Sequence, residues 1–263
     1  MVWSMTHNEL PPVMEVTSLR VQFSGIVAVD DVTFDARPGQ VLGLIGPNGA
    51  GKTTTFNAIT GMVPSTGTIA FNGTEISGMR TEQIARLGIA RTFQHAAVVP
   101  EFTVRDNVLI GAHRHGRFGW IRSGLRLGSA KEAREAAERA DSAIERLGMQ
   151  SIADRTCSEL GLPNLKQVEL ARAIAFEPRV LLLDEPANGL THSEVDELAE
   201  KIAGLHRDSD LCIVLVEHHM GLIRAVSDKL VVLNFGSVLA QGEPNEVLSR
   251  ADVVEAYLGV GAA

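Results

Sequence analysis

The stretch that decides the fold reads Gly46-Pro47-Asn48-Gly49-Ala50-Gly51-Lys52-Thr53, which fits the phosphate-binding pattern G-x-x-x-x-G-K-[ST]. The apolar run 41–45 before it predicts a buried strand, and residues 53–59 after it predict a helix start. In that order, backbone N–H groups of the loop can close around phosphate oxygens at the positive end of the helix. The sequence therefore predicts an α/β fold with a site for a nucleoside triphosphate.

Individual residues of this loop have predicted roles. Lys52 can reach the β- and γ-phosphates, and the hydroxyl of Thr53 can ligate Mg²⁺. The alternative is a chance glycine-rich turn before a helix, which is disfavoured because every fixed position of the pattern is present between a strand and a helix. The predicted nucleotide-binding residues here are Gly46, Pro47, Asn48, Gly49, Ala50, Gly51, Lys52, Thr53 and Thr54.

Composition sets limits on the class of protein. The 263 residues, 45% hydrophobic and 21% charged, suit a soluble globular protein with one large domain or a core plus a subdomain. No apolar run reaches the roughly 18 residues that would span a bilayer. The net charge of −8 gives no general attraction to nucleic acid, so no nucleic-acid partner is expected. Cys157 and Cys212 are so few that they suit a reducing cytoplasm.

The pattern along the chain predicts a sheet core with a helical insertion. Strands are expected at 27–34, 41–45 and 68–71, and again at 180–183 and 213–216, where continuous apolar runs are typical of a covered parallel sheet. Helical patterns dominate between, which predicts a helical subdomain at about 100–177. We expect one domain over 16–259, a flexible leader over 1–15 without the apolar core of a secretory signal, and a short tail over 260–263.

Acidic residues follow the strand expected at 180–183. Asp184 and Glu185 come directly after it, and the carboxyl ends of parallel strands meet at one edge of a sheet, so both should lie near the phosphate loop. Asp184 would hold Mg²⁺, directly or through water, together with Thr53. Glu185 could orient or deprotonate a water for attack. The alternative, an acidic pair in a surface turn, is weakened by the presence of the loop.

A histidine follows the strand expected at 213–216. His218 stands at the third strand end with a polar group, where an imidazole N–H can contact a γ-phosphate. A solvated loop histidine is the alternative, and it is the interpretation we keep for His219. The same holds for His95, His113, His115 and His192, none of which has metal-ligand spacing with a cysteine or carboxylate cluster.

Taken together, these motifs resemble the nucleotide-binding subunits of ABC transporters, and the resemblance covers residues 16–259. It implies a P-loop NTPase fold of the ABC type, with a mixed or parallel sheet core, an antiparallel β subdomain and an inserted helical subdomain. It also implies that Phe23 stacks on adenine and that Gln94, in the run Arg91-Thr92-Phe93-Gln94, senses Mg²⁺ and takes part in catalysis. His218 matches the switch histidine of the family.

Particular runs look most like the ATPases of branched-chain amino-acid importers: Ala28-Val29-Asp30-Asp31-Val32, Gly88-Ile89-Ala90-Arg91-Thr92-Phe93-Gln94 and Glu255-Ala256-Tyr257-Leu258-Gly259. ATPases for urea or amide import and for lipopolysaccharide export share much of this wording and stay open as alternatives.

One segment departs from the family pattern. Where the family has L-S-G-G-Q before a helix, this chain has Leu160, Gly161, Leu162, Pro163 and Asn164. Gly161 lacks the serine hydroxyl and Pro163 lacks a backbone N–H, so two donors are lost from the segment that, in family dimers, reaches the nucleotide of the other subunit. Each charge-assisted hydrogen bond contributes roughly 1.5–3 kcal/mol. The helix N-terminus remains, because Pro163 is expected at the first helical position, where proline is well tolerated, and Asn164 can still present an N–H. The alternative is that this segment has changed by neutral drift because it does little in this chain.

The resemblance implies an ATPase that uses ATP and Mg²⁺ at the cytoplasmic face of the bacterial inner membrane. The expected partners are transmembrane permease subunits, a second ATPase subunit in a heterodimer rather than a homodimer, and a periplasmic solute-binding protein acting indirectly. A soluble ABC ATPase of DNA repair or translation is one alternative, disfavoured because the chain has neither a long coiled-coil insertion nor tandem cassettes. A non-hydrolysing regulatory cassette is the other. Glu185 and His218 argue against it, whereas the divergent segment Leu160 to Asn164 argues for partial inactivity.

Overall fold

A computed structural model describes residues 10–92, 98–113, 129–207 and 209–258. The chain divides into two compact units, residues 1–91 with 179–263, and residues 92–178. The helical subdomain expected at about 100–177 falls within the second of these ranges.

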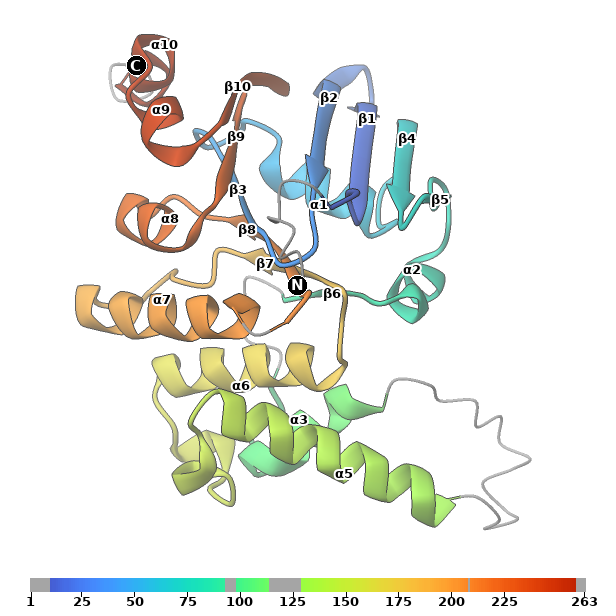
Figure 1. The fold of residues 1–263 in the computed structure, drawn as a ribbon, viewed down its shortest axis with the longest axis vertical. Coiled ribbons are helices and arrows are strands. Elements are labelled where there is room, and N and C mark those ends of the chain that lie inside the picture. The colour runs from blue at the N-terminus through green and yellow to red at the C-terminus, as the bar shows by residue number, and fades with distance from the viewer. Residues whose placement is uncertain (1–9, 93–97, 114–128, 208, 259–263) are drawn as a thin grey trace, which may run out of the picture. The chain divides into compact units, whose positions relative to one another are not determined.

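The first unit contains a six-stranded sheet in the order β10-β9-β3-β8-β7-β6 (Figure 1). All neighbouring strands are parallel except β10, which runs antiparallel to β9 at the edge. Every residue of β3, β7 and β8 is buried, as their continuous apolar sequences predict. The strands are β3 (Val41–Ile45), β6 (Ile89–Arg91), β7 (Val180–Asp184), β8 (Cys212–Val216), β9 (Lys229–Asn234) and β10 (Ser237–Gly242).

A second sheet in this unit is antiparallel and has the order β2-β1-β4-β5. The turn between β1 and β2 is made by Ser24 and Gly25, both with positive φ, which matches the twist of a two-residue hairpin. Because β1 begins at Met14, the expected leader over 1–15 is two residues too long at its end. The strands are β1 (Met14–Phe23), β2 (Ile26–Ala36), β4 (Thr66–Phe71) and β5 (Thr74–Glu75).

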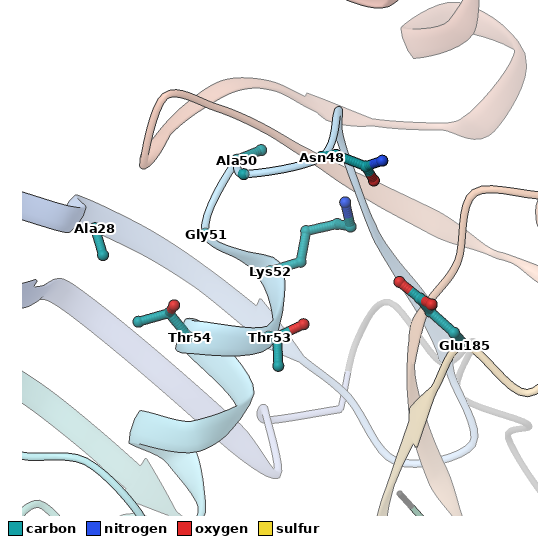
Figure 2. Close-up of a pocket in the computed structure, with 9 residues that line it drawn as sticks. Ala28, Asn48, Ala50, Gly51, Lys52, Thr53, Thr54 and Glu185 are labelled. Carbon is teal, nitrogen blue, oxygen red and sulfur yellow. The ribbon is translucent and has the colours of Figure 1, made fainter. Parts of the chain in front are cut away.

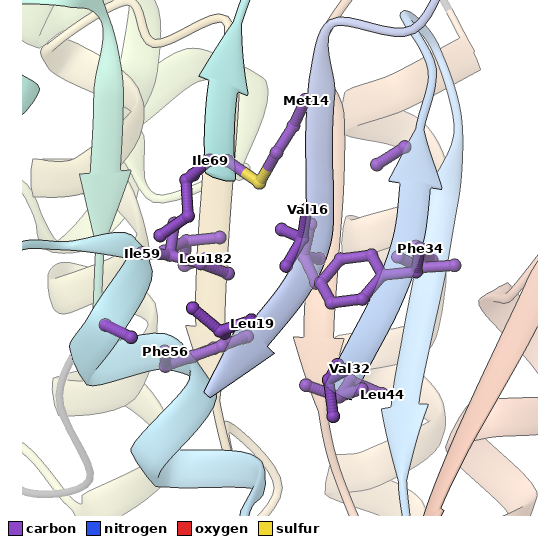
Figure 3. Packing of buried hydrophobic residues seen from close by; sticks show 14 of the residues in the cluster. Met14, Val16, Leu19, Val32, Phe34, Leu44, Phe56, Ile59, Ile69 and Leu182 are labelled. Carbon is purple, nitrogen blue, oxygen red and sulfur yellow. The ribbon is translucent and has the colours of Figure 1, made fainter. Parts of the chain in front are cut away.

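One hydrophobic core joins the two sheets through helix α1 (Lys52–Ile59). Figure 3 shows Leu19 of β1 and Phe56 of α1 in the same cluster as Leu44 and Leu182 of the six-stranded sheet. All four side chains are buried, so the helix that follows the phosphate loop is fixed by packing on its inner face. The remaining helices of this unit are α2 (Thr81–Leu87), α7 (His192–Arg207), α8 (Met220–Val226), α9 (Pro244–Leu248) and α10 (Ala251–Leu258).

The second unit is helical in its described part. Helices α3 (Val104–Ala112), α5 (Ser129–Arg146) and α6 (Leu162–Ala175) pack on one another, and two 3₁₀ turns, η2 (Gln150–Ile152) and η3 (Cys157–Glu159), precede α6. A Cβ atom on Gly111 would lie 2.1 Å from the carbonyl oxygen of Arg172, so α3 and α6 approach closely only because this residue is glycine.

Helix α5 buries Ala136, Ala140 and Ile144 on one face, whereas Ala133, about one turn earlier, is exposed.

The sheets and helices therefore confirm the expected fold class, with a mixed, mainly parallel core, an antiparallel β sheet and an inserted helical unit. Within the described ranges, no helix combines the length and the apolar character needed to cross a membrane.

Candidate nucleotide-binding site

The phosphate loop connects β3 to α1, and its backbone requires glycine at two positions. Gly46 has φ +149°, and a Cβ there would lie 2.1 Å from the carbonyl oxygen of Leu233 in β9. Gly51, the residue before α1, has φ +99°, and its Cβ would lie 2.7 Å from the carbonyl oxygen of Ala28. Neighbouring backbone thus packs against the loop on two sides. This packing holds the backbone of the loop in one conformation, in which its N–H groups can bind an anion.

Lys52 is 7% exposed, although it carries a charge. Its Nζ donates hydrogen bonds to the carbonyl oxygens of Gly46, at 2.7 Å, and Pro47, at 3.0 Å. Burial lowers the pKa of the Lys52 ammonium, and the nearby carboxylates of Glu185 and Asp184 offset part of that shift. The ammonium is therefore already held inside the loop, beside the position that a terminal phosphate would take.

A cavity of about 180 Å³ opens beside the loop. Figure 2 shows Glu185 pointing from the far side of this cavity toward Lys52 and Thr53. Ala28 of β2 also lines it. Sequence reasoning missed this residue, because its small size within the strand expected at 27–34 was its only signal. The lining residues are Ala28, Asn48, Gly49, Ala50, Gly51, Lys52, Thr53, Thr54 and Glu185.

The register of the sheet brings the predicted strand ends together. Val216, the last residue of β8, lies opposite Leu44 of β3 on one side and Asp184 of β7 on the other. The backbone N–H of Glu185 donates to the carbonyl oxygen of Val216 at 2.9 Å. The loop, the acidic pair and the segment that begins at Glu217 therefore lie along one edge of the sheet.

Glu185 has an unusual backbone. Its φ of +48° lies in the left-handed region, which costs a residue with a Cβ atom about 1–2 kcal/mol. Such strain persists only where surrounding contacts hold it, and it is frequent at functional sites. Here it directs a half-buried carboxylate into the cavity beside the phosphate loop.

Asp184 is 2% exposed and has a partner that the sequence did not suggest. Nη2 of Arg91, at the end of β6, donates to its Oδ2 at 2.7 Å. Nη1 of Arg91 donates to Oδ1 of Asn57 in α1, also at 2.7 Å. The carboxylate after β7 is thus linked through one guanidinium to the helix of the phosphate loop.

The two histidines after β8 differ in their surroundings. His218 is exposed and directly follows the buried Glu217. His219 lies at the N-cap of α8, where its Nδ1 accepts a hydrogen bond from the backbone N–H of Leu222 at 3.3 Å. His219 is therefore a helix cap and not the solvated loop residue that the sequence predicted. Its ring accepts a hydrogen bond from one of the backbone N–H groups that have no intrahelical partner at the start of a helix.

Comparison with known proteins now decides the family. A family model described as ABC transporter matches residues 29–188. The chain is 40% identical over 250 residues to the high-affinity branched-chain amino acid transport ATP-binding protein LivG of Escherichia coli K12, covering 94% of this chain and 98% of that protein. It belongs to the ABC transporter ATP-binding family. Members of this family hydrolyse ATP to power transport, so the chain is an ATPase.

Other relatives agree. The ATP-binding protein BraF of Pseudomonas aeruginosa, also described as serving branched-chain amino acid transport, is 38% identical over 94% of this chain and 98% of its own length. Among solved structures, an ATP-binding cassette of an ABC transporter in its ADP conformation matches with a TM-score of 0.83 and 29% identity, covering 95% of this chain and 99% of the other. This ABC ATPase therefore has the fold of a cassette that binds nucleotide.

Two further residues expected at the site of the ABC ATPase have different outcomes. Phe23 is the last residue of β1 and is 43% exposed, on the same hairpin as Ala28 but outside the residues that line the cavity. Gln94 falls in the gap 93–97 and lies outside the described residues.

The divergent segment lies at the start of α6 in the second unit. Gly161 is the N-cap, with an ordinary φ of −75°, and no side chain caps the helix. The helix begins at Leu162, so Pro163 takes its second position rather than the first, where a missing N–H still removes no intrahelical bond. Leu160 and Asn164 flank these residues, at the end of η3 and in the first turn of α6.

The described residues contain no group of three or more His, Cys, Asp or Glu side chains that could hold a metal ion by themselves. Thr53, and Asp184, which Arg91 links to α1, do offer hard oxygen donors. That set suits Mg²⁺, which is commonly bound by one or two protein oxygens together with substrate phosphates.

Proposed function

We propose that this ABC ATPase powers import of branched-chain amino acids through separate permease subunits. The observation that carries the proposal is the match to LivG and BraF along almost the full length of both chains. The nucleotide cavity at the sheet edge supplies the energy-coupling half of that function. Since solute contacts belong to other chains, the solute is inferred from the relatives, and urea, amides and lipopolysaccharide are the competing cargoes.

In this proposal the phosphate loop, Gly46 to Thr54, binds the triphosphate of ATP. Lys52 exchanges its bonds to the carbonyl oxygens of Gly46 and Pro47 for the β- and γ-phosphate oxygens. Phe23, exposed at the end of β1, offers an aromatic face to adenine. Phe23 is not among the residues that line the cavity, but it lies on the β1–β2 hairpin that contributes Ala28 to the lining, and it is the base-stacking group of the proposal.

Mg²⁺ would be held by the hydroxyl of Thr53 and, directly or through water, by Asp184, with Gln94 as a further contact. When bound, it supplies charge neutralisation for the β- and γ-phosphates. Nη2 of Arg91 donates to one oxygen of Asp184 at 2.7 Å, which holds the carboxylate in one orientation.

Hydrolysis proceeds by attack of water in line with the bond between the γ-phosphorus and its bridging oxygen. Glu185 accepts the proton of that water as the new oxygen–phosphorus bond forms, and ADP leaves with the bridging oxygen. His218 donates a hydrogen bond to the γ-phosphate. The support is the placement of Glu185, which lines the cavity across from Lys52 and Thr53 (Figure 2).

The assembly would be a head-to-tail dimer at the cytoplasmic face of the bacterial inner membrane. The segment Leu160–Asn164 would face the nucleotide held by a second, different ATPase, while an ordinary signature of that partner faces the loop of this chain. A periplasmic binding protein would deliver the solute to the permease. Two lost donors in one signature favour such an asymmetric pair over a homodimer, because a homodimer would carry the weakened segment at both sites.

Uptake in a strain that lacks this gene tests the proposal. Uptake of labelled leucine, isoleucine and valine should fall, return with the wild-type chain, and stay low with Lys52→Met, which removes the charge from the loop. Labelled urea and acetamide serve as the control solutes. Unchanged leucine uptake together with a loss of urea or amide uptake would reject the proposed cargo and keep the transport class.

A further inference from the structure

Glu217 is a fully buried carboxylate that joins two segments of the site edge. Its side chain is 0% exposed. Oε1 accepts a hydrogen bond from the backbone N–H of Ala187 at 2.7 Å. Oε2 accepts from the backbone N–H groups of His218, at 2.9 Å, and His219, at 3.1 Å. One side chain therefore binds the turn after β7 and the turn after β8 at the same time.

Both segments contain residues of the proposed reaction. Ala187 follows Glu185 by two positions, in the turn that holds Glu185 in its left-handed backbone conformation. His218 is the proposed γ-phosphate contact. One oxygen of Glu217 binds the turn after β7 and the other binds the turn after β8. A single carboxylate group therefore holds the two turns close together.

The chemistry of Glu217 points to a charged acceptor. Burying a carboxylate is costly unless hydrogen bonds replace its hydration, and three N–H donors at 2.7–3.1 Å do so. An uncharged amide could not serve the same donors, because its NH₂ group would face at least one backbone N–H. With no exposed surface and no place in the cavity lining, Glu217 acts through its neighbours.

We propose that Glu217 is a positioning residue that locks the turn with Glu185 and the turn with His218 into one arrangement for hydrolysis. This rests on the proposed function. ATP binding depends chiefly on the loop after β3, whereas the hydrogen bonds of Glu217 go to the turns after β7 and β8. Loss of the lock should therefore lower turnover and leave nucleotide affinity in place.

The test compares Glu217→Gln with Asp228→Asn. Asp228, an exposed residue, is the control for loss of a carboxylate that accepts a backbone N–H: its Oδ2 accepts that of Val41 at 2.8 Å, at the opposite end of the sheet. We expect Glu217→Gln to lower kcat for ATP about ten- to a hundredfold, the effect of one lost charge-assisted bond, with KM changed by less than about threefold. Asp228→Asn should leave kcat within about twofold of wild type.

Hydrogen exchange supplies a readout that does not need hydrolysis. In wild type the amides of Ala187, His218 and His219 should have protection factors within about tenfold of one another, since opening one carboxylate site exposes all three. Glu217→Gln should lose protection in both turns together, and Asp228→Asn in neither.

Unchanged kcat in a folded Glu217→Gln protein, even with a lower Tm, would overturn the positioning role and leave Glu217 as a stabilising acid. If Glu217→Gln does not fold, wild-type exchange decides, and protection in the two turns that differs by more than about a hundredfold overturns the proposal. Absence of ATPase activity in wild type would reject the proposed function, while exchange would still report on the lock.

Discussion

Arg91 and Asp184 form an ion pair of 2.7 Å between Nη2 and Oδ2, and their side chains are only 7% and 2% exposed. The guanidinium carbon of Arg91 also lies 5.5 Å from the ring centroid of Phe56 in α1. Asp184 is therefore fixed, through Arg91, to the helix of the phosphate loop by an ion pair, a hydrogen bond and packing on an aromatic ring.

Replacing Arg91 by Met should be strongly destabilising, because it leaves the carboxylate of Asp184 buried without its cation. Breaking a buried pair from one side costs about 3–5 kcal/mol. The control is Arg20→Met, which breaks the pair of Arg20 with Asp30, whose side chains are 46% and 49% exposed. An exposed pair contributes about 0.2–1 kcal/mol. Urea unfolding measures both, and equal losses in the two variants would contradict the role assigned to burial.

The phosphate loop gives a second stability prediction. Gly46→Ala should destabilise the protein far more than Gly49→Ala, although both glycines have positive φ. A Cβ at position 46 meets the carbonyl oxygen of Leu233 at 2.1 Å, whereas a Cβ at position 49 meets nothing within 4 Å. We expect about 1–2 kcal/mol for Gly49→Ala, from the backbone alone, and more for Gly46→Ala. Similar unfolding midpoints would show that the loop shifts away from β9 freely.

Much of the fold was predictable because local patterns and tertiary structure agree. The apolar runs 180–183 and 213–216 lie in fully buried parallel strands, and the glycine pattern stands between β3 and α1 as expected. The convergence of Lys52, Thr53 and Glu185 on one cavity followed from a general property of parallel sheets, whose strands present their carboxyl ends at one edge.

The contacts that support the site could not be predicted in this way. Arg91 lies 93 positions from Asp184 in the sequence, and Glu217 lies 30 positions from Ala187, so each pairing depends on strand order and register. The spacing of apolar residues along the sequence does not show the order in which strands pair in a sheet. Ala28 was missed for a similar reason, since its place in the cavity depends on the packing of β2 against the loop.

The lowered pKa of Lys52 predicts a pH dependence of ATP binding. As pH rises through this lowered value, which lies below 10.5, the ammonium loses its proton and its attraction for phosphate. ATP affinity should therefore begin to fall at a lower pH than it would if Lys52 had the pKa of an ordinary lysine. Lys52→Arg keeps its charge over this range, so its affinity should be nearly independent of pH. Titrations from about neutral pH to 10.5 compare the two, and parallel profiles would contradict the assignment.

The start of α6 gives a prediction that separates stability from catalysis. Gly161→Ser should fit, because a Cβ there meets only Cδ of Pro163 at 3.7 Å and φ is −75°. Serine at the N-cap should raise the free energy of unfolding by a few tenths of a kcal/mol relative to glycine. If the segment acts on the nucleotide of a partner, hydrolysis at that partner's site should rise as well, with Glu185→Gln silencing the other site. A gain in stability without a gain in hydrolysis would favour neutral drift.

If Glu185 is the general base, its replacement by glutamine should slow hydrolysis without weakening ATP binding. Steady-state turnover and ATP affinity of Glu185→Gln are therefore measured side by side. Lys52→Met provides the comparison, since it should lose affinity itself. We expect Glu185→Gln to bind ATP within about threefold of wild type and to turn it over about two to four decades more slowly, as expected for a lost general base. Full turnover in that variant would show that Glu185 is not the base.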